Sequence, residues 1–307
     1  MVIKLERPLQ IGMIGLDTSH VSIFAALLHR HQAADTTSSL CGITIGCAYP
    51  GGSSRMELSY SRVERYRDEL IREYGVPMLG SIEAVAEAAD AIMIESVDGS
   101  THLEQFSKVA PYGKPVFIDK PFTTCLADAR AIVALAKRYS VPIMSASSLR
   151  YASALTDALE RVGQGDIIGA DVYGPMPFVQ GQEDYFWYGI HTVEMLFAIM
   201  GYGCRQVHTI CSGDHEVIAG IWGDGRIGAV RGRRQRGSFG ALIHRERGSD
   251  HVDIQPGGKP YYESLLEQAA HFFRKGISPV APEESLEVIG FVEAANRSRE
   301  TGRPYDL

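Results

Sequence analysis

The first half of the chain alternates between short apolar runs and stretches with an apolar residue at every third or fourth position. The runs predict strands and the stretches predict helices. Strands are predicted over residues 9–16, 43–48, 91–94, 116–118 and 141–146, and helices over residues 21–31, 56–74, 83–87, 101–110 and 126–139. Such alternation implies right-handed crossovers and a parallel sheet that is covered on both faces. We therefore predict a Rossmann-like, dinucleotide-binding domain over residues 1–148.

The pattern changes in the second half. Helices are predicted over residues 155–162, 262–273 and 285–298, and strands over residues 170–173, 206–210 and 217–222. The Asp224-Gly225 dipeptide predicts a hairpin turn of type I′, in which both central residues need a positive φ. We therefore predict a second domain over residues 149–307, an α+β domain with a mostly antiparallel open sheet. The fold class is α/β.

Composition narrows the classes of protein to consider. The 307 residues are 45% hydrophobic and 22% charged, as in globular proteins. No apolar run approaches the roughly 20 residues that span a bilayer. The formal net charge of −7 argues against general nucleic-acid binding, which relies on a basic surface. We expect a small-molecule substrate as partner, with no nucleic acid and no membrane.

The cysteines and the opening residues bear on the cellular compartment. Five cysteines form no C-x-x-C pair, which favours reduced and mostly buried thiols over a disulfide or zinc framework. The opening residues 1–8 show neither the apolar segment nor the cleavage site of a secretory signal. We therefore expect a cytoplasmic protein.

Residues 115–122 read PVFIDKPF and form the most informative short segment. Proline lacks an N–H group, so the predicted strand stops before Pro121 and Lys120 lies at its carboxyl end. In a parallel α/β sheet, ligands bind in the crevice at this edge. The alternative is that Lys120 binds no ligand and only makes the end of the strand soluble.

Further motifs follow in a fixed order: Arg150-Tyr151, then Gly-x-His-x-x-acid at residues 189–194, then SRETGRP at residues 298–304. Together with the acid-Lys-Pro segment, this order resembles the Gfo/Idh/MocA family of oxidoreductases over nearly the whole chain. The resemblance implies an NAD(P)-dependent oxidoreductase that acts on a hydroxyl or keto group of a sugar, polyol or cyclitol. It also implies that the second domain, residues 149–307, binds substrate and forms oligomers, and that the protein is a homodimer or homotetramer.

The resemblance implies that Lys120 and His191 are the catalytic pair. When hydride leaves a carbinol carbon, the hydroxyl proton must pass to a group within hydrogen-bond reach. Histidine titrates near neutral pH, and a lysine ammonium stabilises a developing alkoxide. For His191, a histidine satisfied within a partly buried helix is the alternative. The expected substrate contacts are Arg150, Tyr151, Trp187, Tyr188 and Glu194.

The predicted cofactor loop departs from the family pattern. The usual loop, G-x-G-x-x-G, lets the backbone approach the pyrophosphate, whereas residues 15–20 read GLDTSH and keep only the first glycine. Asp17 places a negative charge where a diphosphate would lie. Alternatively, Asp17, Thr18 and Ser19 cap the following helix. The expected cofactor contacts are Gly15, Asp17, Thr18, Ser19, His20, Ser96, Asp98, His102 and Asp119.

The second predicted strand lacks the acid that accepts the ribose hydroxyls in NAD-binding units. Ser53, Ser54 and Arg55 follow it and are suited to a 2′-phosphate, so NADP is slightly preferred over NAD as the expected cofactor. The alternative function is that of a non-redox Rossmann-derived enzyme, such as a lyase, epimerase or hydrolase, or of a ligand-binding protein with lost or altered dinucleotide binding.

The crevice is also expected to gather several imidazole and carboxylate groups, so a divalent metal or a polar ligand is an alternative occupant. The chain lacks H-E-x-x-H and other tight ligand spacings, so we expect no metal. In the second half, a period of two places Arg231 and Arg233 on one face of a strand and Arg234 and Arg236 on the other. That split favours a solvated sheet or a subunit interface over a nucleic-acid stripe.

Overall fold

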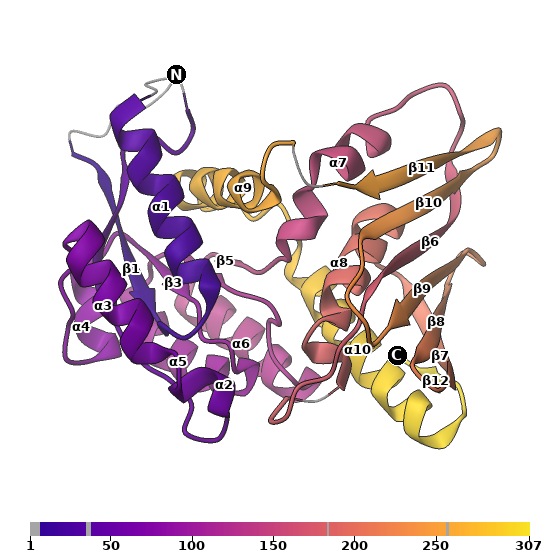
Figure 1. The fold of residues 1–307 in the computed structure, drawn as a ribbon, viewed down its shortest axis with the longest axis horizontal. Helices are drawn as coiled ribbons and strands as arrows, with labels where there is room; N and C mark the ends of the chain where they lie inside the picture. The colour runs from indigo at the N-terminus through magenta and orange to yellow at the C-terminus, as the bar shows by residue number, and fades with distance from the viewer. Residues whose placement is uncertain (1–6, 35–37, 183, 256–257) are drawn as a thin grey trace. The chain divides into compact units, whose positions relative to one another are not determined.

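The computed structural model describes residues 7–34, 38–182, 184–255 and 258–307. The chain forms two compact units, each described here by itself (Figure 1). The first unit contains Met1–Thr123, Arg130–Ser145 and Leu266–Val280, and the second contains Thr124–Ala129, Ala146–Leu265 and Ala281–Leu307. Domains over residues 1–148 and 149–307 remain a prediction. No helix in the described part of the chain is long and apolar enough to cross a membrane.

The first unit is built on a five-stranded parallel sheet with the strand order β2-β1-β3-β4-β5. The strands are β1 Leu9–Ile14, β2 Ile43–Tyr49, β3 Ala91–Ile94, β4 Val116–Ile118 and β5 Ile143–Met144. Every residue of β3 and β4 is buried, which requires cover on both faces of the sheet. The predicted Rossmann-like sheet is confirmed.

The helices that follow these strands begin and end at recognisable residues. They are α1 Ser19–Ala34, α2 Glu57–Tyr60, α3 Val63–Tyr74, α4 Ile82–Ala88, α5 His102–Val109 and α6 Leu126–Tyr139, with short 3₁₀ turns η1 Gly99–Thr101 and η2 Ala110–Tyr112. α9 Tyr261–Lys275 follows β11 in the chain and belongs to the first unit from Leu266 onward. Ser81 caps α4, because its side chain accepts a hydrogen bond from the Ala84 N–H. Gly75 ends α3 in the left-handed conformation, with φ of 66°.

The second unit is built on a mixed, mostly antiparallel seven-stranded sheet, which confirms the predicted fold class. The order is β11-β10-β6-β9-β8-β7-β12, and β6 and β9 run parallel. The strands are β6 Ile167–Pro175, β7 Cys204–Ser212, β8 His215–Trp222, β9 Ile227–Arg233, β10 Phe239–Arg245, β11 Gly248–Ile254 and β12 Tyr305–Asp306.

Two helices of the second unit cover one face of this sheet. α8 Gly189–Met200 packs on β6 and β9, and α10 Pro282–Thr301 packs on β7 (Figure 1). In the core between them, the Phe197 ring lies 5.7 Å from that of Trp222 and 5.6 Å from that of Phe291. The remaining helical segments are η3 Ser148–Tyr151, α7 Ser153–Leu159 and η4 Asp184–Phe186.

Several predicted elements were wrong in extent. The helix over residues 56–74 is interrupted at Ser61 and Arg62, where the short α2 ends before α3 begins. The strand over residues 141–146 reduces to β5, because Ser147 caps the 3₁₀ turn η3 soon after it. The helix predicted over residues 155–162 begins and ends earlier, as α7.

The hairpin between β8 and β9 is confirmed, but its predicted turn type is wrong. Gly225 has φ of 89°, and its N–H donates to the Trp222 carbonyl. Asp224 is not among the described residues with positive φ, so the turn is not of type I′. One glycine in the left-handed region is sufficient to close this hairpin.

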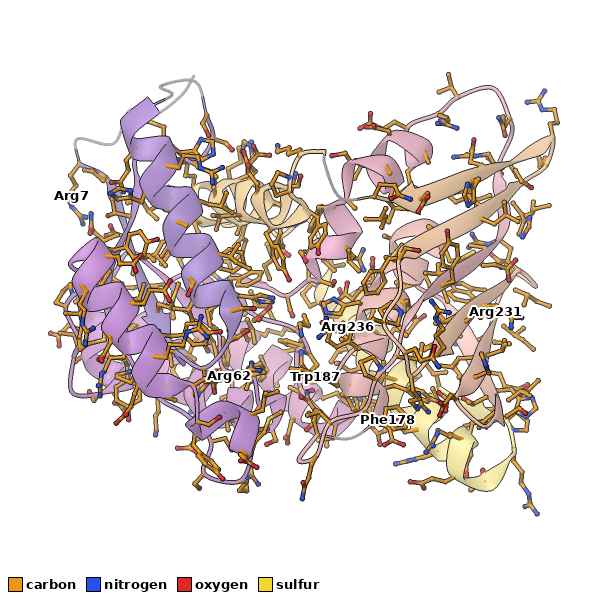
Figure 2. All side chains as sticks on the ribbon, viewed as in Figure 1. Arg7, Arg62, Phe178, Trp187, Arg231 and Arg236 are labelled. Atoms are coloured by element: carbon orange, nitrogen blue, oxygen red, sulfur yellow. The ribbon has the colours of Figure 1, made fainter. Side chains whose placement is uncertain are left out.

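The arginines beyond β9 do not continue its alternation. Arg231 and Arg233 are exposed on one face of the strand, as predicted. Arg231 is labelled in Figure 2. Arg234 lies after the strand end, where its guanidinium carbon lies 3.4 Å from the centroid of the Phe178 ring and its Nη1 donates to the Met176 carbonyl. The predicted opposite face for Arg234 and Arg236 was therefore wrong.

All five cysteines are free thiols, but only Cys47 and Cys204 are buried. Cys211 is exposed, and Cys41 and Cys125 are half-buried. The expectation of mostly buried cysteines was therefore wrong. Cys211 belongs to the end of β7, where three consecutive residues are exposed.

Candidate functional site

Three neighbouring strands of the first unit end at one edge of its sheet. Gly15 follows β1, Glu95 follows β3 and Asp119 follows β4. The parallel ladder continues through Glu95 and Asp119. The Glu95 N–H donates to the Ile14 carbonyl at 2.7 Å, and the Asp119 N–H donates to the Ile94 carbonyl at 2.8 Å. The chain thereby places a tight turn and two carboxylates side by side at the carboxyl ends of the strands, where α/β sheets bind ligands.

Only glycine fits at position 15, because of its backbone conformation and of the close approach of Ser96. Its φ is 86°, and a Cβ atom at this position would lie 2.1 Å from Ser96 Oγ and 2.6 Å from Ser96 N. Its N–H donates to the Tyr49 carbonyl, and the next N–H, of Leu16, donates to the Pro50 carbonyl. The turn after β1 is therefore held against the loops that follow β2 and β3.

Asp17 turns into the protein. Its side chain is fully buried, with Oδ1 accepting from the Val97 N–H at 2.8 Å and Oδ2 accepting from the Ser59 hydroxyl at 2.5 Å. Burial raises the pKa of Asp17, and these two hydrogen bonds oppose part of that increase. The alternative of Asp17 as a helix cap is wrong, because its oxygens are engaged away from α1.

The start of α1 is shaped by Thr18. Its carbonyl accepts from the Val21 N–H at 3.3 Å, and its hydroxyl oxygen lies 3.5 Å from the His20 N atom. Ser19, the first residue of the helix, is exposed, and the first turn contains no acidic residue. The amino end of this 16-residue helix therefore offers a positive dipole end without a competing carboxylate.

The loop after β3 is held by its own polar side chains. Asp98 accepts from the Ser100 N–H (3.1 Å), the Ser100 hydroxyl (2.5 Å) and the Ser53 hydroxyl (2.6 Å). Burial raises the pKa of Asp98, but these hydrogen bonds outweigh it and leave the pKa below its ordinary value. His102 is buried, with Nε2 at 2.8 Å from the Ser96 carbonyl and Nδ1 at 3.1 Å from the Phe122 carbonyl. These contacts fix the His102 ring in the loop.

Lys120 lies at the end of β4 with only 8% of its surface exposed. Burial lowers its pKa, and the neighbouring carboxylates of Asp119 and Glu95 oppose this shift. Asp119 is 2% exposed; its Oδ1 accepts from the Lys120 N–H at 2.8 Å and its Oδ2 lies 2.5 Å from His20 Nδ1. The side chain of Asp119, an expected cofactor contact, is thereby engaged with His20.

Glu95 is the residue of this edge that our sequence analysis missed. It is fully buried, and neither carboxylate oxygen has a hydrogen-bond partner among the described residues. Burial raises its pKa well above the ordinary value, and the charges of Asp119 and Asp17 add to this shift. An acid directly after a four-residue apolar strand is the signal that could have identified it.

In the second unit, His191 belongs to the first turn of α8. The ring is held by Ser147, whose Oγ lies 2.7 Å from Nδ1, and by the rings of Tyr188 and Phe239 at centroid distances of 5.4 and 6.1 Å. The His191 residue is 7% exposed. Sequence reasoning did not identify Ser147, since a single serine in a run of serines carries no distinctive pattern.

Arg150 lies in a buried group of charges. Its Nε lies 2.9 Å from Glu194 Oε2 and its Nη1 lies 2.6 Å from Glu284 Oε1. Although burial disfavours the charged form, the two carboxylates raise the pKa of Arg150 above its ordinary value. Burial also raises the pKa of the neighbouring Tyr151. Arg150 and Glu194 thus bind each other, and their expected role as substrate contacts remains a proposal.

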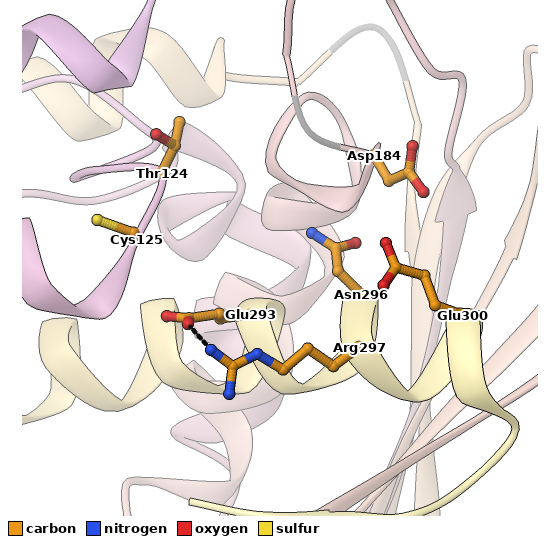
Figure 3. A pocket seen from close by; sticks show the side chains of 7 residues that line it. All are labelled: Thr124, Cys125, Asp184, Glu293, Asn296, Arg297 and Glu300. Atoms are coloured by element: carbon orange, nitrogen blue, oxygen red, sulfur yellow. Dashed lines mark hydrogen bonds and ion pairs between the residues drawn. The ribbon is translucent and has the colours of Figure 1, made fainter.

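A cavity of about 440 Å³ opens elsewhere in the second unit (Figure 3). It is lined by Thr124, Cys125, Asp184, Glu293, Asn296, Arg297 and Glu300. Glu293 is already engaged, because Oε1 accepts from Arg297 at 2.7 Å and Oε2 accepts from the Leu126 N–H at 2.9 Å. None of the predicted site residues lines this cavity.

The structure thus brings the predicted residues together in two sets. The nine predicted cofactor contacts and Lys120 belong to the loops at the carboxyl edge of the first sheet or to the starts of α1 and α5. His191 and the predicted substrate contacts belong to the second unit, where the Trp187 and Tyr188 rings lie 5.7 Å apart. The pairing of Lys120 with His191 stays a prediction.

Comparison with known proteins identifies relatives of both sequence and fold. Residues 9–147 match the model of the Gfo/Idh/MocA family, described as an oxidoreductase family with an NAD-binding Rossmann fold. The uncharacterized oxidoreductase YhhX of Escherichia coli (strain K12) is 24% identical over 121 residues. That match covers 36% of this chain and 35% of the curated relative.

Solved structures resemble the chain over nearly its whole length. GenD2 from gentamicin A biosynthesis, solved in complex with NAD, has a TM-score of 0.77 at 15% identity, with 98% of this chain and 97% of GenD2 covered. The myo-inositol 2-dehydrogenase from Lactobacillus plantarum has a TM-score of 0.76 at 16% identity, with 98% of this chain and 100% of that chain covered. At such identities the likeness shows the fold alone.

Proposed function

We propose that this chain, which belongs through residues 9–147 to the Gfo/Idh/MocA oxidoreductase family, is an NAD(P)-dependent oxidoreductase acting on a hydroxyl or keto group of a sugar, polyol or cyclitol. The observation that carries the proposal is the burial of Lys120, with a lowered pKa, at the carboxyl end of β4. The structural relatives named above include one that binds NAD and one that acts on myo-inositol.

The residues of the first unit fit a dinucleotide at its pyrophosphate. The backbone at Gly15 leaves no room for a side chain, as expected of the first glycine of a cofactor loop. The amino end of α1 starts at exposed Ser19 and suits a phosphate. Asp17 does not oppose this, because its carboxylate is buried against Ser59 and Val97. When bound, the nicotinamide supplies or accepts the hydride.

Lys120 is the group that we propose to hold or move the proton of the substrate oxygen. Burial brings its pKa down from the ordinary lysine range, which makes the neutral amine more accessible than on a surface. In its protonated form the same group stabilises a developing alkoxide, and the buried surroundings strengthen that interaction. Asp119 positions Lys120 through its hydrogen bond to the Lys120 N–H.

His191 is proposed as a second proton-handling group. The contact with Ser147 holds Nδ1 of the His191 ring and thereby fixes the direction of the other ring nitrogen, Nε2. Trp187 and Tyr188 offer aromatic faces, which stack well against the C–H faces of sugars and cyclitols. Arg150, Tyr151 and Glu194 are also proposed to line the substrate site beside these rings, and the ion pair with Glu194 fixes the side chain of Arg150.

The choice between NAD and NADP is left open by this proposal. The slight preference for NADP depended on Ser53, Ser54 and Arg55. Ser53 is buried and its hydroxyl donates to Asp98, while Arg55 Nη2 donates to the Ser100 hydroxyl. Ser53 and Arg55 are thus engaged with the protein, so the structure lends the preference for NADP no support.

We also propose a homodimer or homotetramer. The face of the seven-stranded sheet opposite α8 and α10 exposes Ile210, Ile221 and Ile227, at 61%, 43% and 58% of their surfaces. Ile221 and Ile227 are directly paired across β8 and β9. An exposed apolar strip of this kind is suited to pairing with another sheet.

Steady-state assays test the enzymatic proposal. Purified protein is assayed with sugars, polyols and cyclitols and either NAD⁺ or NADP⁺, and nicotinamide reduction is followed by absorbance. Lys120→Met, which keeps the length and removes the amine, should lower kcat by roughly 10²- to 10⁴-fold. Lys108→Met is the control, because Lys108 is a half-exposed partner of Glu104 on α5. Equal activity of the Lys120 variant and the wild type would reject this role of Lys120.

A further inference from the structure

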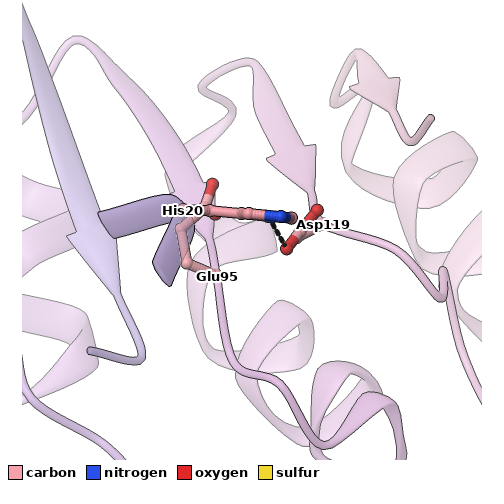
Figure 4. A group of neighbouring side chains, drawn as sticks. All are labelled: His20, Glu95 and Asp119. Atoms are coloured by element: carbon pink, nitrogen blue, oxygen red, sulfur yellow. Dashed lines mark hydrogen bonds and ion pairs between the residues drawn. The ribbon is translucent and has the colours of Figure 1, made fainter. Parts of the chain in front are cut away.

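The cluster formed by His20, Glu95 and Asp119 has more acceptor capacity than the protein satisfies. Each residue offers a ligand atom, and these atoms lie within 4.8 Å of one another in a fully buried position (Figure 4). Asp119 and His20 are joined at 2.5 Å, but both oxygens of Glu95 lack a hydrogen-bond partner among the residues described. Burying a carboxylate without a hydrogen-bond partner costs free energy, so we expect a positively charged group to bind here.

A positive group already lies near this cluster. Lys120 interacts electrostatically with Glu95 and Asp119, but it does not donate a hydrogen bond to either oxygen of Glu95. The buried Glu95 carboxyl group therefore still lacks a partner for its oxygens.

The donor atoms favour a particular class of ion. An imidazole nitrogen combined with two carboxylates suits first-row transition metals and zinc, whereas magnesium and calcium prefer sites made only of oxygen atoms. A cation in the centre would replace the proton shared between His20 Nδ1 and Asp119 and would engage the free oxygens of Glu95.

We propose that His20, Glu95 and Asp119 form a binding site for one divalent transition-metal ion, Zn²⁺ or Mn²⁺. This site is additional to the proposed oxidoreductase function and does not depend on it. The sequence suggested a divalent metal only as an alternative occupant and did not indicate Glu95, because the three ligands come from the start of α1 and from the ends of β3 and β4, with 74 and 23 positions between successive ligands. Only the parallel sheet brings them together.

The test measures metal binding directly. Chelator-treated, dialysed protein is titrated with Zn²⁺ by calorimetry and with Mn²⁺ by electron paramagnetic resonance of the free ion. At least one of the two ions should bind at one equivalent per chain. Glu95→Gln, which keeps the shape and removes the charge, should weaken that binding by about tenfold or more. The bound ion should also raise the Tm of the wild type and leave that of Glu95→Gln nearly unchanged.

The matched control is Asp171→Asn. Asp171 Oδ2 lies 2.8 Å from His244 Nε2 on the exposed part of the second unit, so this change also removes a carboxylate beside a histidine. It should leave metal stoichiometry and affinity unchanged. If Glu95→Gln does not fold, as judged by circular dichroism, His20→Gln replaces it with the same expected loss.

Three outcomes would overturn the site: no saturable binding of either ion, full affinity in the Glu95 or His20 variant, or an equal loss in Asp171→Asn. The readouts require neither dinucleotide nor substrate. A failure of metal binding would therefore reject the metal site without bearing on the oxidoreductase proposal. A lack of dehydrogenase activity would likewise not bear on the metal site.

Discussion

At the scale of single residues, the same type of group behaves differently in different surroundings. Among the carboxylates, Asp98 has a lowered pKa because hydroxyl and N–H groups donate to it. Burial and two neighbouring carboxylates instead raise the pKa of Glu95, and no described group donates to it. Among the thiols, Cys204 is buried and Cys211 is exposed. These contrasts give measurable differences in reactivity and in pH dependence.

The two cysteines of β7 should react at very different rates. Burial raises the pKa of Cys204 to about 12, so almost no thiolate is present at neutral pH, and the side chain is also shielded from reagent. Cys211 is exposed. Iodoacetamide labelling followed by peptide mass spectrometry should modify Cys211 first and Cys204 only as the protein unfolds. Labelling of both at one rate would contradict this arrangement.

Asp98→Asn should destabilise the protein in a pH-dependent way. The folded carboxyl has a pKa below its unfolded value, so its contribution is fully present above that unfolded value, about 3.9, and is lost as the pH falls through the folded pKa. Urea unfolding at neutral pH should show a loss of about 1–3 kcal/mol for the variant. The difference should shrink in acid, and a difference that is constant with pH would refute the proposed cause.

At the scale of elements, local signals in the sequence were reliable where one residue controls a backbone conformation. Ser81 caps α4 and Gly75 ends α3, and α6 and β4 occupy the predicted residues. Where tertiary contacts decide, the predictions were wrong. The Ser59 hydroxyl donates a hydrogen bond to Asp17, 42 positions away, and the helix predicted through this region is interrupted.

Ser81→Ala tests the cap of α4. The Ser81 hydroxyl oxygen accepts from the Ala84 N–H at 3.1 Å, and alanine would leave that group at the start of the helix without its partner. The free energy of unfolding from urea curves should fall by about 1 kcal/mol. Ser61→Ala, at the exposed end of α2, should change it by less than about 0.5 kcal/mol. Equal effects would show that the cap contributes nothing specific.

At the scale of the whole molecule, the sequence predicted the order of the elements and the edge of the first sheet to which residues belong better than the contacts between their side chains. Lys120 could be placed because a strand and Pro121 define its position. Glu95 was missed, since its importance depends on residues that follow two other strands. Ser147 was missed for the same reason, because its contact with His191 joins positions 44 residues apart.

The proposed oligomer gives a prediction at this scale. Light scattering coupled to gel filtration should give two or four times the chain mass for the wild type. Ile227→Lys, which places a charge in the exposed strip of the sheet, should shift the protein towards the monomer without lowering its Tm by more than a few degrees. Ile277→Lys is the control, because Ile277 is 72% exposed and follows α9 in the first unit. A monomeric wild type would contradict the proposal.

The central claim is that the crevice after Gly15 binds a nicotinamide dinucleotide, and direct titration tests it. NADH and NADPH are added separately to the purified protein, and the fluorescence of the reduced nicotinamide is followed. The account predicts a saturable change with at least one of the two cofactors, weakened in Gly15→Ala, whose added methyl group would collide with Ser96. The absence of any signal at millimolar concentrations of both cofactors would contradict it and would favour a non-redox function.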